Sequence, residues 1–112
     1  MHEIPDDINF DYFIGCVLIQ VAVGKREVQL QFLGIGYIAI YGKCEVDGRT
    51  YDVGPAAGAP LLELVDQEVT GVQVHERKHL ELRFGGRTLI VRDSNIGSES
   101  YTADGPHGLI VV

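Results

Sequence analysis

The sequence predicts a mainly β domain, built as an antiparallel two-meander sandwich or half-open barrel with one short helix. Apolar and polar residues alternate with a period of two along most of the chain, and charged or Gly-containing turns separate the alternating runs. Helical spacing is confined to one segment, 60–67. A length of 112 residues is typical of one domain, 1–112. We expect about eight to ten short strands in it.

The first predicted meander lies within residues 13–42. Apolar residues alternate along "VLIQVAV" and, after the charged turn "GKRE", along "VQLQF". Folding back across that turn gives three expected cross-strand pairs, which are Val23 with Val28, Val21 with Leu30, and Ile19 with Phe32. A third strand, "GYIAIYG", follows. Asp47-Gly48 then predicts a further hairpin, because these residue types adopt positive φ readily.

The second predicted meander lies within residues 66–93. The stretch "GPAAGAP" breaks the alternation with prolines and glycines, and it is predicted to be a connecting loop. Pro60 suits the first position of a helix, and the leucines after it predict a short helix over 60–67. Three strands then follow, in "VTGVQV", "HLELRF" and "RTLIVRD". The likeness of the meanders at 13–42 and 66–93 indicates either an internal duplication or the similarity that any two antiparallel meanders share.

The stretch "HERKH" at 75–79 matches the H-E-x-x-H pattern of zinc metalloproteases. That pattern binds zinc only on a helix, where residues four apart lie on one face. Here the apolar residues around it, from Val72 to Phe84, all occupy even positions, which is the period of a strand. We therefore predict a hairpin over 72–84 with its tip at 76–78, which makes the match a chance one. The hairpin pairs Val74 with Leu80, Val72 with Leu82, and His75 with His79.

A facing pair of histidines could still hold a metal adventitiously, through His75 and His79. The other histidines, His2 and His107, lie near the chain ends with no motif around them. No third ligand is apparent. We therefore expect no metal site and no cofactor.

The net charge limits the classes of partner. Nine basic and sixteen acidic residues give a formal charge of −7, which repels nucleic acid and anionic membrane surfaces and favours a basic protein partner. No run of apolar residues approaches the ~20 that a membrane helix needs, and the acidic start does not resemble a signal peptide. We expect a cytoplasmic protein whose cysteines, Cys16 and Cys44, are buried free thiols.

Motifs of common catalytic sites are not found in the sequence. The serines near Asp93 and Glu99 lack a G-x-S-x-G elbow, and the glycine turns lead into strands, whereas a phosphate-binding loop leads into a helix. If the protein is an enzyme, its site must be assembled from scattered residues. The candidates are Glu99, Tyr101 and His107 near the last loops, which we also regard as a candidate binding surface.

The order of the blocks "FIGCVLIQVAVGKREVQLQF", "LLELVDQEVTGVQVHERKHLELRFGGRTLIV" and "SNIGSESYTADGPHGLIVV" resembles that of a family of small uncharacterised bacterial all-β domains. The resemblance rests on a "LxLxFxxGxxLxV" core, an "ES-aromatic" step and a "gpxGxxxV" final strand. The matching residues are Leu80, Leu82, Phe84, Gly86, Leu89, Val91, Glu99, Ser100, Tyr101, Gly105, Pro106, Gly108 and Val111. Members lack an agreed activity. Some similar domains look like immunity proteins encoded beside polymorphic toxins, so the resemblance implies a toxin-like partner.

Three hypotheses for function follow. The first is a non-enzymatic protein-binding module, of the toxin-neutralising immunity type. The second is a structural or assembly domain that forms a homodimer, since the apolar end "GLIVV" must be covered either by its own sheet or by a partner subunit. The third is an enzyme with its site near the C-terminal loops.

Overall fold

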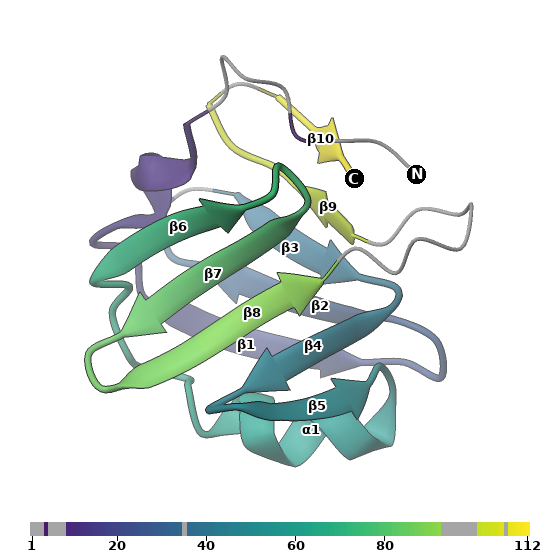
Figure 1. Ribbon diagram of the computed structural model, residues 1–112. Helices are drawn as coiled ribbons and strands as arrows, with labels where there is room; N and C mark the ends of the chain where they lie inside the picture. The colour runs from purple at the N-terminus through teal and green to yellow at the C-terminus, as the bar shows by residue number, and fades with distance from the viewer. Residues whose placement is uncertain (1–3, 5–8, 35, 93–100, 107) are drawn as a thin grey trace.

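Two five-stranded antiparallel sheets face each other in the computed structural model (Figure 1). The structure describes residues 4, 9–34, 36–92, 101–106 and 108–112. The first sheet has the strand order β1 (Leu18–Val23), β2 (Val28–Phe32), β3 (Tyr37–Ile40), β9 (Tyr101–Ala103) and β10 (Ile110–Val111). The second has the order β5 (Arg49–Asp52), β4 (Lys43–Val46), β8 (Arg87–Arg92), β7 (His79–Phe84) and β6 (Gly71–His75). The predicted mainly β architecture is confirmed, as a sandwich whose sheets do not close into a barrel.

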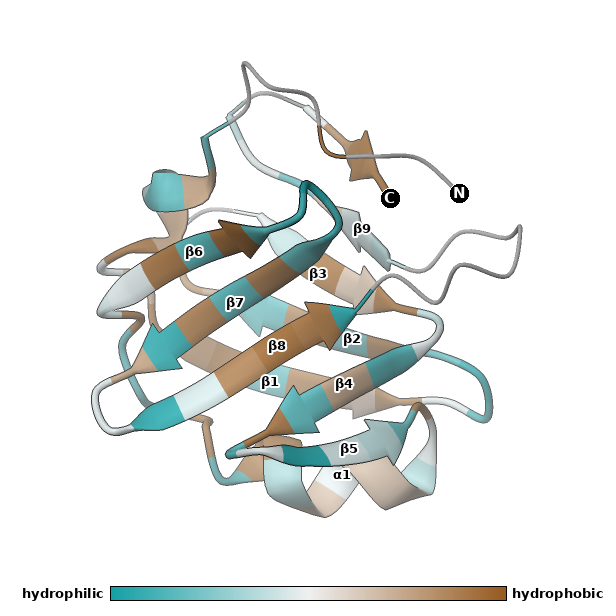
Figure 2. Ribbon diagram, viewed as in Figure 1, coloured by the Kyte–Doolittle hydropathy of each residue, from teal (hydrophilic) through white to brown (hydrophobic). Residues whose placement is uncertain are grey.

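The predicted hairpin over 72–84 is confirmed in every pair. β6 and β7 pair Val72 with Leu82, Val74 with Leu80, and His75 with His79. Polar and apolar residues alternate along β7 (Figure 2), so one side of the strand faces the other sheet and the opposite side faces solvent.

The β1–β2 hairpin departs from its predicted register at one place. Val21 pairs with Leu30 and Val23 with Val28 as predicted, but the pairing of Ile19 with Phe32 is wrong. A bulge between Leu18 and Gln20 inserts one residue, so Leu18 pairs with Phe32 instead. Because one extra residue reverses the side to which each residue points, Leu18 is fully buried and Ile19 is 46% exposed.

The helix begins earlier than predicted. α1 spans Pro55–Leu62, so the predicted loop "GPAAGAP" forms most of the helix and the predicted range 60–67 is wrong. Gly54 caps the helix with a φ of 114° and Pro55 takes the first turn, where a proline costs no hydrogen bond. Residues 63–66 form turns, and Asp66 has a φ of 71° that a helix cannot accommodate.

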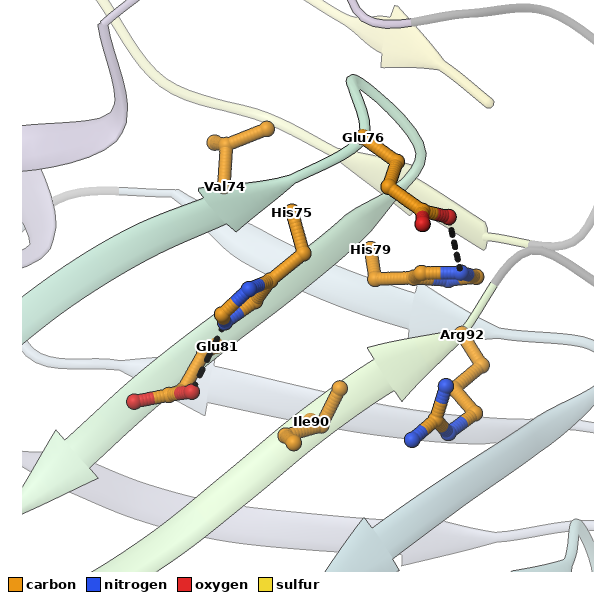
Figure 3. Close-up of a pocket in the computed structure, with 7 residues that line it drawn as sticks. All are labelled: Val74, His75, Glu76, His79, Glu81, Ile90 and Arg92. Carbon is orange, nitrogen blue, oxygen red and sulfur yellow. Dashed lines mark hydrogen bonds and ion pairs between the residues drawn. The ribbon is translucent and has the colours of Figure 1, made fainter.

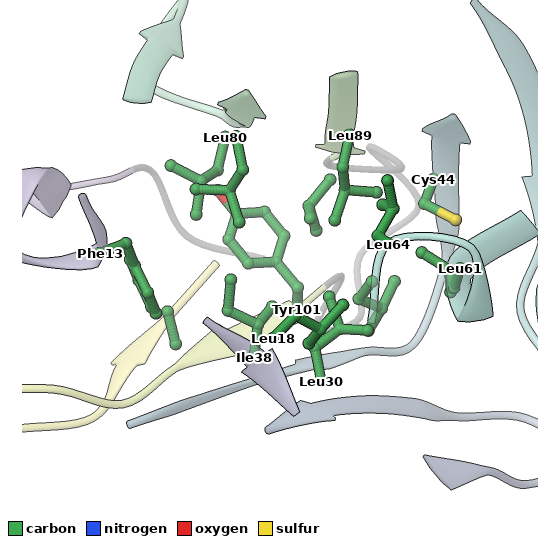
Figure 4. Packing of buried hydrophobic residues seen from close by; sticks show 14 of the residues in the cluster. Phe13, Leu18, Leu30, Ile38, Cys44, Leu61, Leu64, Leu80, Leu89 and Tyr101 are labelled. Carbon is green, nitrogen blue, oxygen red and sulfur yellow. The ribbon is translucent and has the colours of Figure 1, made fainter. Parts of the chain in front are cut away.

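The core lies between the sheets and is closed at its margins by α1 and by the 3-10 helix η1 (Phe10–Phe13) (Figures 1 and 4). The leucines that suggested the helix do enter this core, since Leu61 and Leu64 are fully buried. The largest fully buried side chains come from both sheets, both helices and the segment after α1: Phe10, Phe13, Leu18, Leu30, Ile38, Ile40, Leu61, Leu64, Leu80, Leu82, Leu89 and Tyr101.

The apolar C-terminal strand is paired within the chain on one side. β10 pairs with β9, and Val112 is fully buried, with backbone hydrogen bonds in both directions to Tyr101. β10 is also the edge of its sheet, and Leu109 beside it is 53% exposed, so the homodimer stays a prediction. The predicted duplication also stays a prediction: β1–β2–β3 and β6–β7–β8 are both antiparallel meanders, and each belongs to a different sheet. Within the described part of the chain, no helix is long and apolar enough to cross a membrane.

Candidate functional site

A hollow of about 500 Å³ opens on the outer side of the second sheet, beside the β6–β7 turn (Figure 3). Seven residues line it, which are Val74, His75, Glu76, His79, Glu81, Ile90 and Arg92. Most of them occupy the solvent-facing positions of β6, β7 and β8, and Glu76 stands in the turn. The hollow therefore contains both histidines of the "HERKH" stretch.

The β6–β7 turn shows why this stretch cannot act as a zinc-binding helix. Glu76 and Arg77 have φ values of 56° and 58°, in the left-handed region, whereas a helical zinc motif needs φ near about −63°. Lys78 closes the turn by donating its N–H to the carbonyl of His75, at 3.0 Å. The N-terminal segment is attached here, because Ile4 and Arg77 exchange hydrogen bonds, at 2.7 Å from the Ile4 N–H and 3.2 Å from the Arg77 Nε.

Glu81 is the most connected carboxylate of the hollow. Its Oε1 lies 2.9 Å from His75 Nε2, and its Oε2 accepts a hydrogen bond of 2.7 Å from Arg83 Nε. Burial alone would raise the pKa of Glu81, but the hydrogen bonds from His75 and Arg83 outweigh this effect and hold the pKa below its ordinary value. Glu81 is therefore ionised at neutral pH although its side chain is only 13% exposed.

Two further ion pairs lie on the same side of the sheet. Arg92 binds Glu45 through both its Nε, at 3.2 Å, and a terminal nitrogen. His79 Nε2 lies 4.0 Å from Glu76 Oε2, and the His79 side chain is 15% exposed. A terminal nitrogen of Arg83 also donates a hydrogen bond to Gln73. We define the charged face as the residues on the outer side of the second sheet that the hydrogen bonds of Glu81, Arg83 and Arg92 connect: Glu45, Gln73, His75, Glu81, Arg83 and Arg92.

Metal binding has little support in this arrangement. Across residues 4, 9–34, 36–92, 101–106 and 108–112, no three His, Cys, Asp or Glu side chains are grouped so that they could hold a metal ion. His75 and His79 face each other across the hairpin, but each imidazole lies beside a carboxylate on its own side, Glu81 or Glu76.

Of the three residues of the predicted binding surface near the C-terminal loops, the structure describes Tyr101. Glu99 and His107 lie outside the described residues. Tyr101 is fully buried, and its hydroxyl donates a hydrogen bond of 2.9 Å to the Lys78 carbonyl. Tyr101 and Ala103 are two residues apart and lie on the same, inner side of β9. The Tyr101 side chain is therefore in the core and contributes no binding surface.

The cysteines have the environment expected of structural thiols. Cys44 is fully buried, and this burial raises the pKa of its thiol to about 11. Cys16 is partly buried and packs against the core, and burial raises its pKa as well. Both thiols are free. A raised pKa keeps a thiol protonated and therefore unreactive at neutral pH.

Sequence reasoning missed Glu81 and Arg92, which complete the hollow around the histidines. The signal was present in the strand period. Once His75 and His79 are assigned to the solvent side of a hairpin, Glu81 must share that side. Its neighbour on the adjacent strand β8 is Ile90. The partner of Arg92 could not be found in this way, because Glu45 comes from β4, a strand 47 residues away in sequence.

Fold and site together define a β-sandwich that carries a charged, hollowed outer face on one sheet. No known family model, curated protein or solved structure matches this chain.

Proposed function

We propose that this protein is a non-enzymatic binding module that engages a basic protein partner through the charged face. The observation that carries the proposal is the network around Glu81, a partly buried carboxylate held ionised by His75 and Arg83 beside a hollow of about 500 Å³. A solvent-facing sheet position does not need such an arrangement, because a neutral side chain satisfies the fold without the cost of removing a charge from water.

The chemistry of the hollow supports binding over catalysis. Both oxygens of Glu81 are engaged, Oε1 with His75 and Oε2 with Arg83, so this carboxylate holds the side chains around it in place. The described residues that line the hollow include no serine, threonine or cysteine that could serve as a nucleophile. A surface of this kind offers oriented charges and a partly apolar floor at Ile90, which are the elements of a protein-recognition site.

Charge selects the class of partner. The formal charge of −7 of the whole chain attracts a basic protein at long range. Within the charged face, two carboxylates and two arginines balance, so this face supplies oriented contacts, and Glu76 at the rim of the hollow adds a carboxylate whose side chain is 80% exposed. The resemblance to small bacterial domains of the immunity type extends the proposal to a specific role, the neutralisation of a toxin encoded by an adjacent gene.

The test compares partner capture by three forms of the protein. Wild type, Glu81→Lys and Gln29→Lys are immobilised and exposed to extract of the source organism; Gln29 lies on the outer side of the other sheet, so Gln29→Lys adds a charge away from the charged face. We expect a basic protein that is retained by wild type and Gln29→Lys and lost with Glu81→Lys. Equal retention by all three forms would contradict the proposal, provided that their circular dichroism spectra agree.

The toxin-neutralising role has a separate test. The neighbouring gene product is expressed in a heterologous host with and without this protein, and growth is followed. Rescue by wild type and by Gln29→Lys, with loss of rescue by Glu81→Lys, is the expected result. Growth arrest that no form relieves would reject neutralisation but would leave protein binding to be judged by the capture experiment.

A further inference from the structure

A second pocket, of about 340 Å³, lies at the end of the sandwich away from the β6–β7 turn. Three connections meet there: the β1–β2 turn, the β3–β4 turn and the junction between β5 and α1 (Figure 1). The side chains that matter for its chemistry are Lys25, Arg26, Tyr41, Lys43, Asp52 and Val53.

The pocket is positively charged although the protein is acidic. Three cations, Lys25, Arg26 and Lys43, and one carboxylate, Asp52, give a local charge of +2, against −7 for the whole chain. Lys43 Nζ lies 3.8 Å from Asp52 Oδ1, and both side chains are exposed, at 58% and 80%, so this pair is weak. Among the described residues, none forms a side-chain hydrogen bond or ion pair with Lys25 or Arg26.

The backbone around these cations is held by specific contacts. Gly24 N–H donates to the Glu27 carbonyl, at 2.8 Å, which closes the turn that carries Lys25 and Arg26. The Val53 N–H donates to the Gly42 carbonyl, at 3.1 Å, and fixes the opposite wall. Gly54 packs against the β1–β2 turn so closely that a Cβ there would lie 3.0 Å from the Lys25 carbonyl oxygen. The pocket is therefore shaped by the fold as well as by mobile side chains.

The walls combine an aromatic surface with the start of a helix. Tyr41 is 38% exposed, and Val53 is partly buried and packs against the core. Val53 is followed by Gly54, the N-cap of α1, which makes no side-chain capping hydrogen bond. The partial positive charge at a helix N-terminus adds to that of the three side chains. An anion that carries an aromatic ring complements such walls better than a bare inorganic ion does, because the ring of the ligand can pack on Tyr41.

We propose that this pocket binds a small organic anion, a phosphate monoester carried on an aromatic ring. The phosphate would lie among Lys25, Arg26 and Lys43, whose charges together with that of Asp52 sum to +2 and so match a dianion, and the ring would lie against Tyr41 and Val53. This site is separate from the charged face, and neither proposal depends on the other.

The test is a ¹H–¹⁵N NMR titration of the whole protein with phenyl phosphate. We expect saturable shifts at the amides of residues 24–26, 41–43, 52–54 and 56, with a dissociation constant of about 1 mM. A double variant, Lys25→Gln with Arg26→Gln, should weaken binding about tenfold. Arg49→Gln is the matched control, because Arg49 is exposed and does not line the pocket. This control should leave the affinity within about twofold.

Two further arms separate the phosphate from the ring. Inorganic phosphate should bind more weakly than phenyl phosphate, and Tyr41→Ala should reduce the affinity for phenyl phosphate while leaving that for inorganic phosphate unchanged. Shifts scattered over the whole surface, or equal losses in the double variant and in Arg49→Gln, would overturn the site. Equal affinity for both ligands with no effect of Tyr41→Ala would overturn the aromatic part.

Discussion

The solvent-facing sides of the two sheets carry different kinds of side chain, although both sheets cover the same core. The first sheet presents uncharged residues to the outside along β1 and β2, and these residues, which we call the neutral face, are Gln20, Ala22, Gln29 and Gln31. The second sheet presents the charged face. Both are the outward sides of antiparallel sheets that cover one shared core.

The neutral face shows that this fold does not require charge on a sheet exterior. Gln31 donates to Gln29, at 3.4 Å, and Gln29 donates to the carboxylate of Glu27 just before β2, at 3.1 Å, so the bond within the neutral face joins two uncharged side chains. Glu81, in contrast, is ionised and partly buried, and its hydrogen bonds to His75 and Arg83 offset the solvation energy that this burial costs. The neutral face covers the same core without such a network, which is why we propose the charged face as the recognition surface.

The largest effect is expected from substitutions in the core. They test whether the inner sides of the two sheets contribute equally to stability. Leu30 and Leu82 are fully buried at the centres of β2 and β7. Leu30→Ala and Leu82→Ala should each lower the free energy of unfolding by about 3 kcal/mol, measured by urea denaturation, because each removes core contacts and leaves a cavity. If one variant costs less than about 1 kcal/mol, the sheets do not share one cooperative core.

The next largest effect concerns the turn between β4 and β5, where a carboxylate binds residues of β8. Asp47 accepts hydrogen bonds from the Thr88 N–H, at 2.9 Å, and from Arg87, and these bonds lower its pKa. Asp47 also has a φ of 50°. Asp47→Ala should therefore cost about 2 kcal/mol in thermal or urea unfolding, through the lost bonds and the strained backbone. Asp47→Asn should recover part of this loss, since asparagine tolerates that backbone conformation; equal losses in both variants would show that the backbone contributes nothing.

A smaller effect measures the polar link between the sheets. The Tyr101 hydroxyl, from the first sheet, donates to the Lys78 carbonyl at the β6–β7 turn. Tyr101→Phe keeps the ring in the core and should cost about 1 kcal/mol in urea unfolding. Tyr37→Phe is the control, because Tyr37 is a partly exposed tyrosine of β3. The link would be unimportant for stability if the two variants unfolded alike.

The two sheets also differ in how well the sequence predicted them. The β6–β7 register followed from the strict alternation between Val72 and Phe84 together with a short charged tip, so local rules were sufficient. The β1–β2 register failed at Ile19, because nothing in "VLIQ" distinguishes a regular strand from one with a bulge that turns Leu18 inward. The early start of α1 was missed since glycine and proline in "GPAAGAP" indicate a loop unless tertiary contacts hold them in a helix.

The candidate site was predictable only in part, for a related reason. Strand parity gives the side on which His75, His79 and Glu81 lie, because all three belong to one hairpin. Parity says nothing of which strand follows β7 in the sheet, so the contribution of Arg92 and its partner Glu45 depends on the strand order β4–β8–β7. The burial of Tyr101 likewise depends on β9 crossing to the first sheet beside β3.

The smallest expected effect concerns the charge of Glu81 alone. It tests directly the feature in which the charged face differs from the neutral face. At neutral pH, Glu81→Gln should lower the free energy of unfolding by less than about 1 kcal/mol, since its pairs with His75 and Arg83 are partly exposed to water. The folded-state pKa of Glu81 is lowered, so its contribution is present above the unfolded value of about 4.3 and is lost as pH falls through the folded pKa. The stability difference between wild type and Glu81→Gln should therefore be constant from neutral pH down to about 5 and should shrink at lower pH. Glu68→Gln, which removes an exposed carboxylate outside the charged face, should show no such convergence in parallel urea titrations. A difference that grew on acidification would mean that the carboxylate destabilises the folded sheet, and the charged face would then lose its central residue.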